Sequence, residues 1–141
     1  MDLNRIRQTI SELDKEAEAI RQRIDEIAEE VAAIGSPVID GMPAIRTGKS
    51  DPTASRAVIL AERIRKHRER LQAIESERSH IIRSVRAACH GFGHKQRTVV
   101  LLRIEGKPYR VIATRIGCSV RQTQRIFAIC GKKLQNRQIR T

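Results

Sequence analysis

Aromatic side chains are nearly missing from this chain of 141 residues, which has two Phe, one Tyr and no Trp. Such a chain offers few side chains that could line an aromatic ligand pocket. Its three cysteines form no C-x-x-C pair, so a disulfide framework is not expected. No apolar run approaches the roughly 18–20 residues of a membrane span, and the N-terminus lacks a signal-peptide core. We expect a cytoplasmic protein of one or two small domains with no membrane partner.

Acidic side chains are also scarce at one end of the chain. Residues 89–141 contain 12 Lys and Arg but only one acid, Glu105, whereas residues 1–34 contain nine acids and five bases. A merely solvated surface would mix both signs. An excess of Lys and Arg on a compact domain binds nucleic acid by releasing counterions, and no basic stretch has the wide apolar face of a membrane binder. Nucleic acid is therefore the expected partner, and the helix-turn-helix pattern described below makes double-stranded DNA the specific expectation.

An uninterrupted apolar repeat fills the first 34 residues. Its positions alternate spacings of three and four, which keeps one stripe of a helix against a partner, as in a coiled coil. Gly35 and Pro37 end the repeat and open a segment rich in Pro and Gly. We expect a coiled-coil helix at 1–34 and an irregular linker at 35–52. The apolar positions are Leu3, Ile6, Ile10, Leu13, Ala17, Ile20, Ile24, Ile27, Val31 and Ile34.

A second long helix is expected at 53–88, with Asp51 as its N-cap and Pro52 at its first position. Two positions of its seam are polar, His67 and Arg78. They are either frayed edges or residues that fix register and partner number. The first helix is acidic and the second basic, which favours pairing between them, within one chain or between two.

A single pair of helices buries little surface, so we expect a dimer or a higher oligomer. The sequence does not choose the number of chains. The residues expected to hold the oligomer together are Leu3, Ile6, Ile10, Leu13, Ile20, Ile24, Ile27, Ile64, Leu71, Ile74 and Ile81.

The C-terminal residues predict a hinge at 89–95 and a helix-turn-helix domain at 96–141, built from three short helices. The central pattern is Ala113, Gly117 and Ser119. A small Ala lets two helices approach, Gly takes the left-handed conformation at a sharp turn, and Ser caps the next helix. The whole chain is therefore expected to be all-α: two long coiled-coil helices joined by a linker, then a helix-turn-helix domain.

The first turns of the last helix carry side chains suited to reading bases. Arg can bind guanine and Gln can bind adenine through two hydrogen bonds each. The candidate base-reading residues are Arg121, Gln122, Gln124 and Arg125. Further residues are assigned to backbone phosphates, a role that sets affinity but not sequence choice. They are Lys107, Tyr109, Arg110, Arg115, Ser119, Lys132, Lys133, Arg137 and Arg140.

The stretch LLRIEGKPYRVIATRIGCSVRQTQRIFAICGKKL resembles the region-4 helix-turn-helix of sigma factors. Together with the leading coiled coil and the linker, nearly the whole chain resembles the RinA/ArpU-like late transcriptional regulators of bacteriophages and prophages. The linker residues that carry this resemblance are Gly41, Met42 and Pro43, then Ser50, Asp51, Pro52, Thr53 and Ala54.

This resemblance implies an activator that binds promoters of phage late genes, for packaging, structure or lysis. The sigma-like domain implies either contact with host RNA polymerase or substitution for a sigma contact. The chain departs from the family at Thr123, where an apolar residue is usual, at Gly131, where Ala is common, and at Ile104, where an aromatic is often found. These departures concern the stability of the last helix more than its role.

No catalytic constellation stands out, so we expect a protein that is not an enzyme and has no cofactor. Cys89, His90, His94 and Cys118 fit no standard zinc spacing, so no metal is expected. A phage small terminase subunit, which joins a helix-turn-helix to coiled-coil helices but forms rings that mark DNA for packaging, is the main alternative. A coiled-coil interaction protein with incidental basicity is a third.

Overall fold

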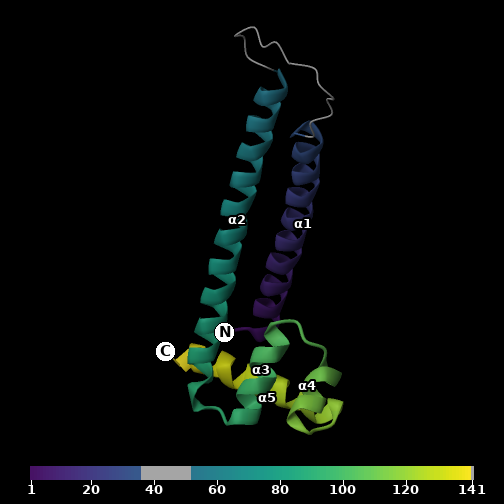
Figure 1. Cartoon of the computed structure of the whole chain (residues 1–141). Helices are drawn as coiled ribbons and strands as arrows, with labels where there is room; N and C mark the ends of the chain where they lie inside the picture. The colour runs from purple at the N-terminus through teal and green to yellow at the C-terminus, as the bar shows by residue number, and fades with distance from the viewer. Residues whose placement is uncertain (36–51, 141) are drawn as a thin grey trace. The chain divides into compact units, whose positions relative to one another are not determined.

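The computed structural model describes residues 1–35 and 52–140, and within them every regular element is a helix. This confirms the all-α class. The Gly-Met-Pro motif and Ser50–Asp51 of the linker lie outside the described residues. The elements are α1 (Leu3–Gly35), α2 (Pro52–Ala88), a 3₁₀ turn (Cys89–Gly91), α3 (His94–Ile104), α4 (Tyr109–Ile116) and α5 (Val120–Arg140), shown in Figure 1.

The long helices begin where local chemistry predicts. Asp2 caps α1, since its Oδ1 accepts hydrogen bonds from the backbone N–H of Asn4 at 3.1 Å and of Arg5 at 3.4 Å. Pro52 is the first residue of α2, as expected of a residue whose missing N–H costs nothing in the first turn. Both helices run uninterrupted because neither contains an internal Gly or Pro.

The described chain divides into two compact units. The core unit comprises Met1–Lys15 and Glu75–Thr141, and the two-helix unit comprises Glu16–Ile74. The three C-terminal helices belong to the core unit together with the first turns of α1 and the last turns of α2. α3 and α4 are short, as predicted, whereas α5 has 21 residues. The predicted helix-turn-helix domain at 96–141 is therefore only part of a larger folded body.

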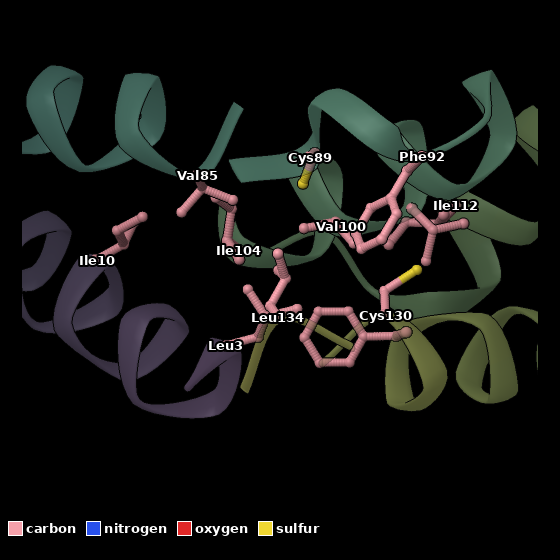
Figure 2. Close-up of a cluster of buried hydrophobic side chains, with 12 residues drawn as sticks. Leu3, Ile10, Val85, Cys89, Phe92, Val100, Ile104, Ile112, Cys130 and Leu134 are labelled. Carbon is pink, nitrogen blue, oxygen red and sulfur yellow. The ribbon is translucent and has the colours of Figure 1, made fainter. Parts of the chain in front are cut away.

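One hydrophobic cluster holds the core unit together. It draws side chains from all five helices and from the turn that follows α2. Figure 2 shows Leu3 and Ile10 of α1 in the same cluster as Leu134 of α5. The buried members are Leu3, Ile10, Val85, Cys89, Phe92, Val99, Val100, Ile104, Ile112, Phe127, Cys130 and Leu134.

Two residues of the expected hinge at 89–95 are instead part of the core. Cys89 and Phe92 are both buried, and α3 begins at His94 inside the segment. Arg137 of α5 also reaches back, with one guanidinium N–H donating to the carbonyl of Ala88 at 3.1 Å. The physical reason is size: three short helices alone bury too little apolar surface, so the flanking segments complete the core.

In the two-helix unit, α1 and α2 pair antiparallel within one chain. Glu16 pairs with Arg70 at 2.8 Å, and Glu30 pairs with Arg56. Residue numbers in α1 thus rise as those of their partners in α2 fall. The pairing fits the charge, since residues 16–35 carry six acids and two bases while residues 52–74 carry six bases and two acids. The apolar residues buried in this unit are Ala17, Ile27, Leu60 and Ile74.

The seam residues that were expected to join separate chains therefore pack largely within one chain. Leu3, Ile6, Ile10 and Ile81 belong to, or pack against, the core cluster. Leu13, Ile27 and Ile74 are also buried, whereas Ile20, Ile24, Ile64 and Leu71 are half-buried. A 3–4 repeat states that a helix has a partner but not whether the partner is in the same chain, which is why the sequence left both alternatives open.

The polar seam residue Arg78 has a defined role in the core unit. Its Nε donates to Asp14 Oδ1 at 2.9 Å, which joins α2 to α1. This favours the interpretation that Arg78 fixes the register of the pair. His67, the other polar seam residue, is half-buried in the two-helix unit.

Candidate nucleic-acid interface

The turn between α3 and α4 is built around Arg103. One of its guanidinium N–H groups donates to the carbonyl of Lys107 at 3.1 Å, and its guanidinium carbon lies 4.0 Å from the centre of the Tyr109 ring. Tyr109 in turn packs edge-on against Phe127 of α5, with ring centres 6.3 Å apart. Gly106 permits this turn with a φ of 96°. Arg103 thus fixes the segment that presents Lys107 and Arg110.

The turn between α4 and α5 has the conformation that the sequence pattern predicted. Gly117 is left-handed, with φ 71° and ψ 34°. The backbone N–H groups of Gly117 and Cys118 both donate to the carbonyl of Ala113, the latter at 3.0 Å. Ala113 is buried, so a larger side chain there would overpack its surroundings.

Ser119 caps α5 through a reciprocal capping box. Its Oγ accepts from the backbone N–H of Gln122 at 3.1 Å, and Gln122 Oε1 accepts from the backbone N–H of Ser119 at 3.1 Å. Two backbone donors at the start of the helix are thereby satisfied. This confirms the predicted cap and corrects one detail, because the side-chain oxygen of Gln122, a candidate base reader, is committed to the cap.

Thr123 is compatible with the fold even though an apolar residue was expected there. Its side chain is fully buried, and its hydroxyl donates to the carbonyl of Ser119 at 2.8 Å. The hydroxyl is thus hydrogen-bonded inside its own helix, which offsets the cost of burying it.

The remaining candidate base readers are exposed on α5. Arg121, Gln124 and Arg125 all lie in its first two turns, with their side chains open to solvent. Glu105, the one acid of residues 89–141, is the C-cap of α3 and not part of α5. The start of α5 thus offers two guanidinium groups and one amide.

The predicted phosphate-contacting residues have different surroundings. Exposed side chains are found at Lys107, Arg110, Arg115, Ser119, Lys132 and Lys133. Tyr109 is half-buried beneath Arg103. Arg137 is turned toward the end of α2, where its guanidinium carbon lies 5.3 Å from the centre of the Phe92 ring. Arg137 thus has contacts within the fold, and since its side chain is also exposed, its phosphate contact stays a prediction. The side chain of Arg140 lies outside the described part of the molecule.

Two basic residues near this surface were missed by sequence reasoning. Arg103 lies at the end of α3 and braces Tyr109. Lys95, near the start of α3, places its Nζ 4.0 Å from Cys118 Sγ at the helix-turn-helix turn. Local spacing could not reveal this contact, because the two residues are 23 positions apart.

The cysteines differ sharply in environment. Cys89 and Cys130 are fully buried in the core cluster, and burial raises the pKa of both thiols. Cys118 is only half-buried, at the turn.

Within the described residues, no three His, Cys, Asp or Glu side chains gather as a metal site would require. No helix in the described ranges is long and apolar enough to cross a membrane.

Comparison of the chain with protein-family models, with curated proteins and with solved structures finds no match. The resemblance to phage late regulators therefore stays a prediction from the motifs themselves. Function is inferred instead from the geometry and charge of the core unit.

Proposed function

We propose that this protein is a sequence-specific DNA-binding transcription regulator. The observation that carries the proposal is the capped helix α5, which follows a left-handed glycine turn and exposes Arg121, Gln124 and Arg125 in its first two turns. A helix presented in this way enters the major groove with its N-terminal residues toward the base edges.

The exposed side chains fall into two groups, one that contacts bases and one that contacts backbone phosphates. Arg121 and Arg125 suit guanine and Gln124 suits adenine, each through two hydrogen bonds. Phosphate contacts that hold the protein in register come from Lys107 in the turn before α4, from Arg110 in α4, and from Lys132 and Lys133 further along α5. The 12 bases against one acid in residues 89–141 support this assignment.

The protein acts, in this proposal, as an oligomer and as an activator of phage or prophage late genes. The oligomer forms through apolar side chains that a single chain leaves uncovered. These include the half-buried Ile20, Ile24, Ile64 and Leu71, and the exposed Val58 and Ile59 of α2. Activation follows, in the proposal, from the resemblance of residues 101–134 to sigma region 4, through contact with host RNA polymerase or through substitution for a sigma contact. The protein has no catalytic role in the proposal.

Competitive DNA binding at about 150 mM salt tests the proposal, since non-specific contacts are weak under that condition. Duplex fragments that tile the neighbourhood of the gene compete with random duplex. We expect one fragment to be preferred by about a thousand-fold or more. Arg121→Ala and Arg125→Ala should abolish that preference, whereas Arg63→Ala, an exposed arginine of the two-helix unit, should leave it intact.

Uniform, salt-sensitive binding to every fragment would contradict a promoter-reading role and favour DNA packaging instead. A stable ring in sedimentation measurements would point the same way, because small terminase subunits act as rings. Absence of DNA binding at low salt would reject both functions.

A further inference from the structure

A second basic surface lies beside the helix-turn-helix and is built from three helices. Arg86 of α2, His94 and Lys95 of α3, and Arg115 of α4 all line one groove of the core unit. Sequence reasoning assigned only Arg115 among them to DNA. We call these four side chains the flanking basic patch.

Lys95 connects this patch to the recognition helix. Its ammonium nitrogen lies 4.0 Å from Cys118 Sγ. Cys118 directly precedes Ser119, the N-cap of α5. The ammonium group therefore lies beside the turn that leads into α5, the helix that carries Arg121.

The groove is most positive at the end where Lys95 lies beside Cys118. Glu105 is the only acid that lines the groove, and it lies ten residues after Lys95 in the chain, as the C-cap of α3. At 1.5 Å per residue, their backbone positions are about 15 Å apart along the helix axis. Against this one carboxylate, the groove is lined by the positive charges of Arg86, Lys95 and Arg115. The end near the helix-turn-helix turn thus stays positive.

We propose that the flanking basic patch, with Lys95 at its centre, binds a backbone phosphate of the DNA that α5 reads. This inference rests on the proposed function and extends the DNA footprint from α4 and α5 to α3. A phosphodiester is favoured over an acidic protein because the patch is continuous with the helix-turn-helix turn. An ammonium group is also a compact donor for a single phosphate oxygen.

The salt dependence of binding tests the role of Lys95. The probe is a fluorescein-labelled duplex of about 30 base pairs and random sequence, bound by the full-length protein and followed by anisotropy from low to physiological salt. Each phosphate neutralised adds about 0.9 to the slope of log K against log salt. Lys95→Met should therefore lower the slope by about 0.9 and weaken binding severalfold. Lys66→Met, an exposed lysine of the two-helix unit, is the matched control and should leave the slope unchanged.

The half-buried thiol at the turn provides an independent readout in the unaltered protein. Cys118 should react with iodoacetamide well before the buried Cys89 and Cys130. Saturating duplex should slow its alkylation at least several-fold, because a phosphate against Lys95 lies within a few ångströms of the sulfur. Mass spectrometry of digested peptides assigns the modified thiol.

Either of two results overturns the inference: a Lys95→Met slope equal to that of the parent protein, or unchanged alkylation of Cys118 in the complex. Both leave the proposed function standing if Arg121→Ala and Arg125→Ala still impair binding. An absence of duplex binding by the parent protein is a different outcome, which rejects the proposed function and the inference together. Circular dichroism of each variant establishes that an exposed substitution leaves the helices folded.

Discussion

Two glycines show how backbone conformation decides the effect of one methyl group. Gly117 is left-handed, a conformation that costs an L-residue roughly 1–2 kcal/mol. Gly131 lies inside α5 with ordinary backbone angles, and a Cβ there would meet Leu3 Cδ1 at 3.8 Å, an ordinary contact distance. The sequence flagged both positions, but only the folded structure separates a required glycine from a replaceable one.

We expect Gly131→Ala to stabilise the protein and Gly117→Ala to destabilise it. Alanine in a helix interior is favoured over glycine by roughly 0.8–1 kcal/mol, whereas alanine at Gly117 must bear the left-handed strain. Urea unfolding followed by circular dichroism measures both free-energy changes. Destabilisation by Gly131→Ala would show that α5 and α1 leave no room for a methyl group at this point.

At the scale of elements, the first turns of α1 belong to the same folded body as α3, α4 and α5. Leu3 and Ile10 are buried in the same cluster as Cys130 and Leu134 of α5 (Figure 2). The apolar repeat predicted that these residues have a partner. It did not predict α5, because a repeat records which face of a helix is covered and not by what. The buried turn at Cys89 and Phe92 escaped prediction for a related reason, since its glycines resemble those of an exposed linker.

Leu3→Ala should therefore loosen the C-terminal helices. Truncation of a buried leucine typically costs about 2–5 kcal/mol. The expected result is a lower unfolding midpoint and faster iodoacetamide modification of Cys130, measured by mass spectrometry under native conditions. Ile24→Ala, at a half-buried position of the two-helix unit, is the control. If Cys130 reacted equally fast in the parent protein and in Leu3→Ala, α1 would have no part in holding α5.

At the scale of the whole molecule, opposite charges are separated along the chain. The acids gather in α1 and the bases in α2 and beyond, and in the two-helix unit the two signs meet across the helix pair. Hydrogen bonds from Arg70 hold the pKa of the Glu16 carboxyl below its usual value of 4.5. Because its pKa is lowered in the folded protein, the ionised carboxylate stabilises the fold at pH values above 4.5. That stabilisation is lost as the pH falls and Glu16 becomes protonated.

Acid should therefore erase the difference between the parent protein and Glu16→Gln. At neutral pH the variant lacks the ionised partner of Arg70, and we expect a small loss of stability, as is usual for exposed pairs. Below the lowered pKa, Glu16 is itself neutral, so the two proteins should unfold alike. Urea midpoints from about pH 7 down to about pH 3 measure this convergence. Glu18→Gln, which removes the same charge but pairs with Arg21 within α1, controls for overall charge.

The features that depend on near neighbours in the chain could be predicted from the residues alone. These are the all-α class, the ends of the long helices, the left-handed turn at Gly117 and the Ser119 cap, each fixed by a few consecutive residues. Tertiary structure alone decided which distant side chains meet: Arg137 with Ala88, Lys95 with Cys118, and α1 with α5. The physical reason is that local backbone preferences act over a few residues, whereas packing joins segments that are far apart in the chain and only the folded core brings together.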